Sequence, residues 1–153
     1  MIIRKANKKD IDSILKLWLE SIKFHKKFDK NMYSIDGNIL KDQKDSIYKA
    51  INDKKRRIFV VESNGQAVAY VWGLIKKQKK RKIGVIADII VTKKYRNKGV
   101  GKSLIKKILR FFKEFDCDKA QASVFGENID AIKAYSKFGF KNHILIMEKN
   151  FKK

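Results

Sequence analysis

The chain of 153 residues contains no proline, a single cysteine and eight glycines. One cysteine excludes a disulfide within the chain, so we expect a location in the reducing cytoplasm. Residues Met1–Arg4 do not begin a secretory signal, and no apolar run approaches the ~20 residues that span a bilayer, so no membrane partner is expected. The length, with 44% hydrophobic and 11% aromatic residues, predicts one folded domain over residues 1–153.

Acidic residues are also scarce, since 16 Asp and Glu stand against 38 Lys and Arg, and the formal net charge is +22. A field of this sign attracts polyanions and repels polycations such as polyamines. Only six of the cations are arginines, the usual readers of phosphates and bases, and the lysines are spread along the whole chain. We interpret the charge as a compositional bias and expect no nucleic-acid partner; a basic nucleic-acid or ribosome-associated protein is the alternative.

One stretch in the second half of the chain combines a strand pattern with a helix pattern. From Val85 to Val91, apolar residues occupy both parities, which is typical of a strand buried on both faces. After a short basic loop, apolar residues return at helical spacing, namely Val100, Leu104, Ile108, Phe111 and Phe115. The stretch therefore predicts a strand, a loop and an amphipathic helix that begins near Gly99.

The loop between strand and helix has the composition of an anion-binding site. A helix that begins near Gly99 leaves several N–H groups without intrahelical acceptors, beside the positive end of its dipole. Gly99 and Gly101 let the backbone approach a bulky anion, and Arg96, Lys98 and Lys102 add full charges. The spacing fits neither a P-loop, because position 94 is Lys, nor a dinucleotide-binding GxGxxG, because position 104 is Leu. The pattern predicts a phosphate or pyrophosphate ligand.

This loop, Arg96-Asn97-Lys98-Gly99-Val100-Gly101, resembles the Arg-x-x-Gly-x-Gly signature of the GNAT superfamily of acetyltransferases. The resemblance implies that these six residues, with Lys102, bind the pyrophosphate of acetyl-coenzyme A (acetyl-CoA). It also implies that Ile89, Ile90 and Val91 pair through their backbone with the pantetheine arm, as an added strand would.

A second motif follows about thirty residues later. The segment Asn128-x-x-Ala131-x-x-x-Tyr135-x-x-x-Gly139-Phe140 resembles the next signature of the same superfamily. The resemblance places Asn128, Ala131 and Tyr135 among the cofactor-binding residues, with Tyr135 facing the thioester sulfur. Taken without the resemblance, Asn128 is a helix cap and Tyr135 is a core aromatic of an amphipathic helix.

The resemblance implies transfer of an acetyl group from acetyl-CoA to a primary amine by direct attack in a ternary complex. The acceptor is a protein N-terminus, a lysine or a small-molecule amine, and no residue decides among them. The amine must lose a proton, and the tetrahedral oxyanion needs a fixed donor. In the superfamily the backbone N–H at Val91 is that donor, and the phenol at Tyr135 protonates the departing thiolate. A catalytically silent module that binds coenzyme A is the alternative.

The general base is the least defined part of this chemistry. Asp88 lies on the predicted strand among apolar neighbours that would raise the pKa of its carboxyl, or else it pairs with one of the many lysines. His25, near the end of the first predicted helix, is a second candidate and, with Phe28, a candidate substrate contact. The alternative for His25 is a helix-end histidine stabilised by the helix dipole. Glu62 and Glu127 are fallbacks.

Two other kinds of site are not expected. Cys117 stands between Asp116 and Asp118, whose charges disfavour a thiolate, so we reject it as a covalent nucleophile. No metal site is predicted. The chain forms a homodimer or stays monomeric, a choice that the sequence leaves open.

The order of elements predicts an α/β (α+β) fold. We expect a GNAT-like mixed, mostly antiparallel sheet of six to seven strands with helices on both faces, whose central parallel pair splays to admit the cofactor. Asp36-Gly37 is predicted to be a turn, Asn64-Gly65 a hairpin turn, and residues 76–82 a basic turn. Strands are predicted at 2–6, 57–63, 66–75, 85–91, 119–125 and 140–150, and helices at 11–27, 39–51, 99–115 and 129–138.

Overall fold

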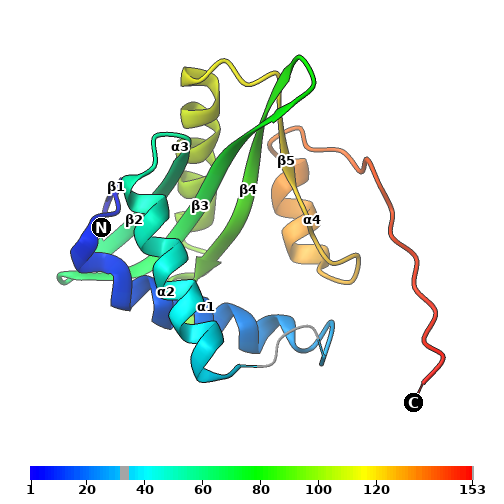
Figure 1. Ribbon diagram of the computed structural model, residues 1–153, viewed down its shortest axis with the longest axis horizontal. Helices are drawn as coiled ribbons and strands as arrows, with labels where there is room; N and C mark the ends of the chain where they lie inside the picture. The colour runs from blue at the N-terminus through cyan, green and yellow to red at the C-terminus, as the bar shows by residue number, and fades with distance from the viewer. Residues whose placement is uncertain (32–34, 153) are drawn as a thin grey trace. The chain divides into compact units, whose positions relative to one another are not determined.

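The computed structural model of the protein describes residues 1–31 and 35–152, which form two compact units, Met1–Ser123 and Val124–Lys153. The first unit contains one sheet and its helices, shown in Figure 1. Its elements are β1 (Ile2–Lys5), a 3-10 turn (Lys8–Asp10), α1 (Ile11–His25), α2 (Gly37–Asn52), β2 (Arg56–Ser63), β3 (Gln66–Gln78), β4 (Arg81–Val91), a 3-10 turn (Lys93–Tyr95), α3 (Val100–Glu114) and β5 (Lys119–Ala122). The second unit contains α4 (Ile129–Ser136) and the chain that follows it.

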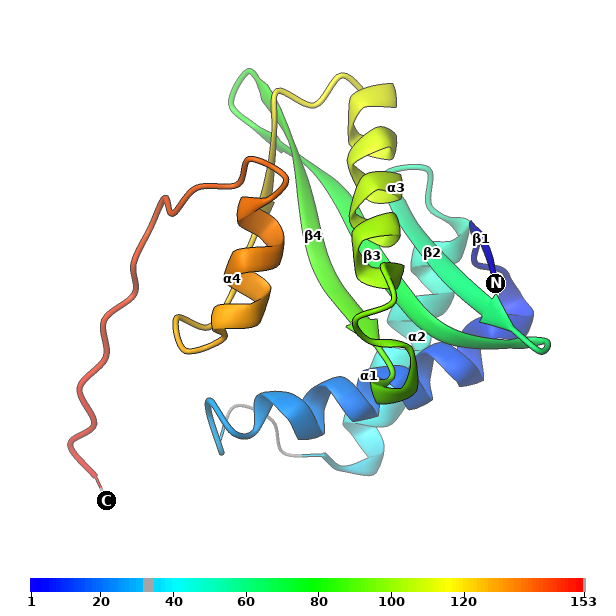
Figure 2. The same cartoon turned by 180° about the vertical axis from the view of Figure 1, so that it is seen from behind.

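The sheet has five strands in the order β1-β2-β3-β4-β5. Neighbouring strands from β1 to β4 pair antiparallel, and β4 pairs parallel with β5 across the α3 crossover. Helices α1 and α2 cover one face and α3 covers the other, as the two opposite views show (Figures 1 and 2). The predicted fold class is confirmed, with five strands in place of the expected six to seven.

Glycines in two central strands let α3 lie close to the sheet. A Cβ atom added at Gly73 would collide with Ile108, and one added at Gly84 would collide with the ring of Phe112. Ile108 and Phe112 are themselves buried, so the helix has no room to retreat without losing apolar contacts. On the opposite face, α1 and α2 bury a cluster that includes Ile14, Leu17, Ile47, Ile58, Val60, Tyr70, Trp72 and Ile90.

The predicted last strand, residues 140–150, is wrong for the single chain. Phe140–Lys152 forms no helix and no strand, and Ile144, Leu145, Ile146, Met147 and Phe151 are exposed. The alternation of residues favours a strand, but a strand exists only where a neighbouring edge accepts its backbone hydrogen bonds. Of the helices in the described residues, none combines the length and apolar character needed to cross a bilayer.

Of the three predicted turns, one is confirmed, one is wrong and one is shorter than predicted. Asn64 and Gly65 both have positive φ and join β2 to β3, which confirms the predicted hairpin turn. The predicted turn at Asp36-Gly37 is wrong, because the Asp36 carboxylate accepts the N–H of Ile39 and caps α2. The basic turn at 76–82 is shorter than predicted, since Lys76 to Gln78 and Arg81 to Lys82 belong to the paired strands.

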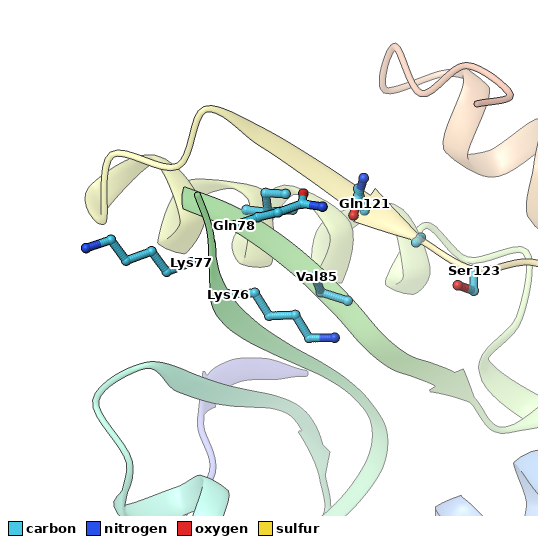
Figure 3. Close-up of a pocket in the computed structure, with 8 residues that line it drawn as sticks. Lys76, Lys77, Gln78, Val85, Gln121 and Ser123 are labelled. Atoms are coloured by element: carbon cyan, nitrogen blue, oxygen red, sulfur yellow. The ribbon is translucent and has the colours of Figure 1, made fainter. Parts of the chain in front are cut away.

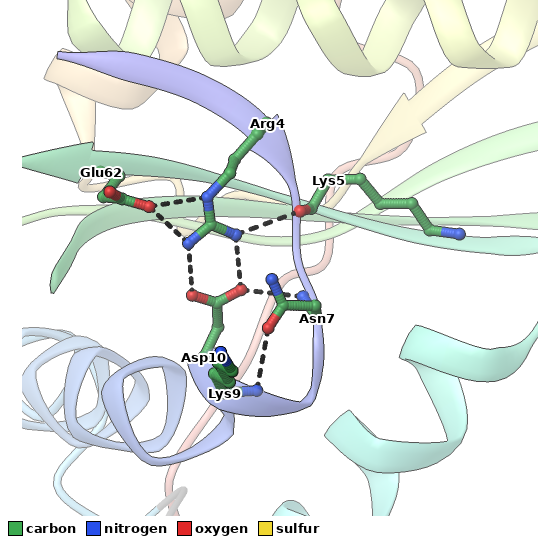
Figure 4. Close-up of polar contacts among 6 residues, drawn as sticks. All are labelled: Arg4, Lys5, Asn7, Lys9, Asp10 and Glu62. Carbon is green, nitrogen blue, oxygen red and sulfur yellow. Dashed lines mark hydrogen bonds and ion pairs between the residues drawn. The ribbon is translucent and has the colours of Figure 1, made fainter. Parts of the chain in front are cut away.

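An arginine joins the first strand to the start of α1 and to β2 (Figure 4). The Arg4 guanidinium donates to both carboxylate oxygens of Asp10, at 2.7 and 2.8 Å, and to Glu62 at 2.7 Å. Asp10 also accepts the N–H of Asn7, whose side chain accepts the N–H of Lys9 and caps the same turn. Burial of Asp10 opposes its charge, yet the bonds from Arg4 and Asn7 together lower the pKa of its carboxyl.

Replacing Arg4 tests this junction. Arg4→Gln leaves Asp10, whose side chain is 6% exposed, without its cation, and should lower the free energy of unfolding by about 2–4 kcal/mol at pH 7. Because the pKa of Asp10 is lowered by folding, its stabilising effect is present above about pH 4 and is lost as the pH falls further. Urea unfolding should therefore give a smaller deficit at pH 3 than at pH 7. Arg110→Gln, which breaks an exposed pair with Glu114, is the control and should stay within about 0.5 kcal/mol; equal losses for both variants would contradict the assignment.

Candidate active site

The middle of β4 contains one extra residue relative to β3. Gly73 pairs with Ile86 and Trp72 with Asp88, so Ala87 is left as a β-bulge. The bulge reverses which face the side chains point to. Ile86, partner of Gly73, shares the α3 face, whereas Asp88 and Ile90, partners of Trp72 and Tyr70, share the α1 face. In a regular strand, Ile86 and Asp88 would point to the same face. Because the bulge at Ala87 shifts the alternation by one residue, they point to opposite faces.

The same position ends the pairing of β4 with β5. The last parallel pair is Ile86 with Ala122, while β4 continues to Val91 with pairs to β3 alone. The Thr92 N–H bonds to the Val68 carbonyl on the β3 side, at 3.2 Å. Because successive backbone groups of a strand alternate in direction, the N–H and C=O groups of Val91 and Ile89 point to the opposite edge, and those of Ile90 point to β3. Because the Arg96 Nε–H already bonds to the Val91 carbonyl at 2.9 Å, the Val91 N–H and the backbone of Ile89 are the groups that this edge offers to a ligand.

The basic loop follows directly after this edge. Asn97 and Gly99 have positive φ, at 58° and 77°, and Lys98 between them does not. Such an alternation turns successive N–H groups into one concavity, a nest that suits an anion. Gly99 is the N-cap of α3 and no side chain caps it, so the first-turn N–H groups of Val100 to Lys102 stay available to a ligand. A Cβ at Gly101 would meet Val91 at an ordinary 3.8 Å, so the protein itself does not require a glycine there.

Arg96 has a structural contact within the loop. Its Nε donates to the Val91 carbonyl at 2.9 Å, and its guanidinium lies 5.3 Å from the ring centre of Phe24 at the end of α1. Arg96 is exposed overall, so the rest of its guanidinium can meet an anion. The contact joins the loop to the end of β4 and to α1.

Asp88 lies against a buried tyrosine. The Tyr70 hydroxyl donates a short hydrogen bond to the Asp88 carboxylate, and Tyr70 is fully buried. Burial raises the pKa of Asp88 above its ordinary value, although the bond from Tyr70 and the charge of His25 act in the opposite direction. Burial, followed by the charge of Asp88, raises the pKa of Tyr70, so the phenol stays a proton donor to the carboxylate. No lysine pairs with Asp88 among the ion pairs of the described residues.

The end of α1 brings aromatic rings to the same face of the sheet. His25 Nδ1 lies 3.4 Å from Ser21 Oγ, and the His25 ring lies 5.7 Å from that of Phe24 and 6.5 Å from that of Phe28. Trp72, the ladder partner of Asp88, has a buried Nε1–H with no acceptor among the described residues.

The residues of the second motif lie in the other compact unit. Asn128 Oδ1 accepts the N–H of Ala131 at 3.2 Å and so caps α4. Tyr135 is 8% exposed, and its ring lies 5.1 Å from that of Phe140. Gly139, with a φ of +83°, lies in the turn that follows the C-cap of α4 at Lys137. The cap at Asn128 is thus present, and its contact with a cofactor stays a prediction.

Two hollows lie on the first unit. One of about 190 Å³ adjoins the basic loop and is lined by Lys98, Gly99, Val100 and Ser103 together with residues of β1 and β2. The other hollow, of about 350 Å³, is lined in part by Val85 of β4. Val85 precedes Val91, at the end of β4, by six residues, or about 20 Å of strand, so this hollow is separate from the basic loop. Figure 3 shows Lys76, Val85, Gln121 and Ser123 around this second hollow.

Within the first unit, the structure brings together the predicted Asp88, His25 and Phe28, and separately the predicted edge and loop from Ile89 to Lys102. Sequence reasoning missed Tyr70 and the bulge at Ala87. Tyr70 shared a predicted strand face with Trp72, but only the register of β3 on β4 makes it a partner of Asp88.

Burial is the main cause that raises the pKa of the Cys117 thiol, with Asp118 and Asp116 adding to it. No cluster of metal-ligating side chains occurs among residues 1–31 and 35–152.

A mixed sheet whose parallel pair ends at Ile86 and Ala122, with a basic loop and a helix after its longer strand, defines the fold as α/β. The model of the acetyltransferase (GNAT) family matches residues 13–140. The chain therefore belongs to the GNAT family.

Individual relatives agree with this assignment. An uncharacterized N-acetyltransferase of Methanocaldococcus jannaschii is 30% identical over 145 residues, which cover 91% of this chain and 60% of that protein. The chain thus spans about three fifths of that relative's length. A solved structure of a putative acetyl transferase from Pyrococcus furiosus is 26% identical, with a TM-score of 0.74 over 98% of this chain and 99% of that one. A mutant Bacillus halodurans protein, 20% identical with a TM-score of 0.85 over 99% and 100%, shares the fold.

The raised pKa of Asp88 makes a prediction about stability. Folding raises this pKa, so the protonated carboxyl is favoured in the folded state. The free energy of unfolding therefore falls as the pH rises from about 4 through the pKa that Asp88 has in the folded protein. Asp88→Asn keeps an acceptor for the Tyr70 hydroxyl but cannot ionise. We expect it to match or exceed the parent at pH 7, by up to about 1 kcal/mol or 2–4 °C in Tm, and to vary less with pH.

The control for this measurement is Asp45→Asn on an exposed turn of α2, which should leave the Tm unchanged at every pH. A lower Tm for Asp88→Asn than for the parent at pH 7 would show that the ionised carboxylate stabilises the fold. That result would contradict the environment described here.

Proposed function

We propose that this chain is an N-acetyltransferase that moves an acetyl group from acetyl-CoA to a primary amine by direct attack. The observation that carries the proposal is the open edge of β4, with the outward backbone groups of Ile89 and Val91 directly before the nest at Asn97–Gly99. A strand edge suits the amides of a pantetheine arm, and the nest suits a pyrophosphate. Membership of the GNAT family supports the same co-substrate.

The proposed binding residues divide by the part of acetyl-CoA that they would hold. Arg96 to Gly101, with Lys102, bind the pyrophosphate through backbone N–H groups and lysine charges. The backbone of Ile89 and Val91 binds the pantetheine arm, and Ile90 contributes its side chain alone. Asn128 and Ala131 belong to the same proposed cofactor set from the second unit.

The proposed chemistry uses three groups of this chain. Asp88 accepts the proton of the attacking amine, directly or through water, because its raised pKa brings it closer to the range useful for a base. The Val91 N–H, which points to the open edge, donates to the oxyanion. Tyr135 donates a proton to the departing thiolate. Tyr70 is a positioning residue that holds the Asp88 carboxylate in one orientation through its hydroxyl.

The acceptor is a primary amine that enters on the α1 face. Phe24, His25 and Phe28 form an aromatic wall there, and Trp72 offers an N–H donor that lacks an acceptor among the described residues. The net charge of +22 repels polycationic amines at a distance, so we expect peptides or small amines of low or negative charge to be better acceptors. We infer a cytoplasmic location from the requirement for acetyl-CoA.

Gly101→Ala separates cofactor binding from folding. The protein leaves room for the added methyl group, and Ala is the better helix former, so the free energy of unfolding should stay equal or rise by about 0.4–1 kcal/mol. The methyl group would stand where the pyrophosphate approaches, so the Kd for acetyl-CoA, measured by calorimetry, should rise at least about 10-fold. Gly37→Ala, at the first residue of α2 and equally unobstructed, should leave that Kd unchanged. An unaltered Kd for Gly101→Ala would remove the loop from the cofactor site.

The activity itself is tested by following thiol release from acetyl-CoA with a panel of peptide and small amines. Tyr135→Phe should retain the Kd for acetyl-CoA and lower kcat by about 100-fold or more, because it removes a general acid. Tyr48→Phe, on a half-exposed tyrosine of α2, should keep full activity. Turnover that survives in Tyr135→Phe would assign the acid elsewhere. Binding of acetyl-CoA without turnover of any amine would favour the catalytically silent module.

A further inference from the structure

One end of the sheet brings together cations from two separate segments. All four residues of Lys54–Arg57, at the start of β2, and six of the seven residues of Lys76–Lys82, at the β3–β4 hairpin, are Lys or Arg. The two segments are neighbours, because the Ile75 N–H bonds to the Lys55 carbonyl at 2.9 Å. Both views place them at the end of the sheet away from the point where β4 ends (Figures 1 and 2). The lysines are spread along the sequence, but the fold concentrates cations here.

The β3–β4 hairpin projects from this end as a ribbon of two strands. Strand β2 pairs with β3 as far as Leu74, and β5 starts opposite Ile83, so beyond these residues β3 and β4 pair with each other alone. Asp118 fixes the base of the ribbon, because its N–H bonds to the Lys82 carbonyl at 2.9 Å and its carboxylate accepts the Lys82 N–H at 2.8 Å. Residues 76–82 are all exposed, so their side chains are available to a partner.

Cations occupy both faces of the ribbon. Lys82 Nζ donates to the carbonyl of Phe115, after α3, at 3.2 Å, so Lys82 and its ladder partner Lys77 lie on the α3 face. Lys76 and Arg81 lie on the other face, and Figure 3 shows Lys76 and Lys77 directed apart. Lys77 stands directly opposite Lys82 in the ladder, and a like-charge pair in this position destabilises a hairpin. Among residues 1–31 and 35–152, none of the ion pairs involves the ribbon, so a bound anion would relieve this repulsion.

The acids near this end do not cancel its charge. They are four, against ten cations in the two basic segments, namely Asp53, Glu114, Asp116 and Asp118. Asp53 already pairs with Arg56 at 3.3 Å, and Glu114 with Arg110 at 3.2 Å. The surface formed by residues 54–57 and 76–82 therefore stays strongly positive, which suits a polyanion.

We propose that the β3–β4 ribbon inserts into the major groove of double-stranded DNA, while Lys54–Arg57 contacts the phosphates beside the groove. A ribbon with cations on both faces matches a groove with phosphates on both walls, whereas a single strand would meet one face only. The major groove of B-DNA is about 12 Å wide and about 8.5 Å deep, and it admits a two-stranded β-ribbon. From Lys77 to the turn at Lys79 and Lys80, the ribbon extends about 7–10 Å, which matches that depth.

The same chemistry defines what the ribbon does not select. The major groove of A-form RNA is too narrow for side chains to read, so duplex RNA fits less well. Lysine supplies charge without the planar fork with which arginine reads guanine, so binding is independent of base sequence. Phosphate contacts of this kind weaken steeply as salt is added, because binding releases the counterions of the DNA.

The test uses the full chain without acetyl-CoA, so its outcome is independent of the proposed enzymatic activity. Fluorescence anisotropy with a labelled duplex of about 20 base pairs should show saturable binding, with a log–log slope of Kd against NaCl of about 4–6, since each phosphate contact adds about 0.9. Duplexes of different sequence should give the same Kd. Absence of saturable binding at about 0.05 M NaCl overturns the proposal.

Two triple variants that lose the same charge locate the surface. The tip variant combines Lys79→Gln, Lys80→Gln and Arg81→Gln. The control removes exposed lysines from the first 3-10 turn, α1 and α2, by Lys9→Gln, Lys16→Gln and Lys41→Gln. The tip variant should raise the Kd for the duplex at least about 10-fold and lower the salt slope by about 2–3, whereas the control should change the Kd less than about 3-fold. Equal losses would show that net charge alone attracts the DNA, and would contradict the proposal.

A footprint on the parent chain gives the same answer without any substitution. Chemical modification of lysine amines, followed by mass spectrometry, should show that the duplex protects Lys77, Lys79 and Lys80 but leaves Lys16 and Lys41 reactive. A single strand of the same length should bind at least about 10-fold more weakly, and tighter binding of the single strand contradicts insertion into a groove. Vesicles that contain phosphatidylserine are the last comparison. If the tip substitutions abolish binding to vesicles but not to the duplex, the ribbon contacts a membrane surface and the proposal is wrong.

Discussion

One additional residue in a strand, Ala87, determines the arrangement of the candidate site. The bulge places Asp88 on the α1 face, opposite Tyr70 and Trp72, where burial and a phenol hydrogen bond surround its carboxylate. It also coincides with the last residue pair between β4 and β5. A bulge increases the local twist of its strand, which accounts for the loss of the parallel partner at this point. The environment of Asp88 and the open strand edge therefore have a common cause.

The loop after β4 shows how a very basic chain uses its cations. Most of the lysines are solvated, and the described ion pairs involve few of the 38 cationic residues. Arg96 differs because its guanidinium bonds the last carbonyl of β4 and lies over Phe24, so it connects the strand end, the loop and α1. The backbone also contributes to the loop, because the positive φ angles of Asn97 and Gly99 turn successive N–H groups to one side. An anion at this loop would meet oriented backbone N–H groups in addition to the net positive charge.

Much of the fold could be predicted from the sequence because its signals are local. The Asn64-Gly65 turn and the apolar period of α3 each act within a few residues. The errors are of two kinds. Asp36-Gly37 reads as a turn, but the Asp36 carboxylate accepts the N–H of Ile39 and caps a helix. Residues 140–150 read as a strand, but a strand also needs a partner distant in the chain, and the structure pairs them with none.

For the candidate site, the sequence by itself determined the basic glycine loop, the two motifs and the carboxylate at Asp88, because the residue types and their spacing are written in order. Only the tertiary structure decided that Tyr70 bonds Asp88, and that Ile89 and Val91 rather than Ile90 turn their backbone outward. The reason is that strand register, and with it the face to which each side chain points, is set by pairing between distant segments and shifts with a single bulged residue.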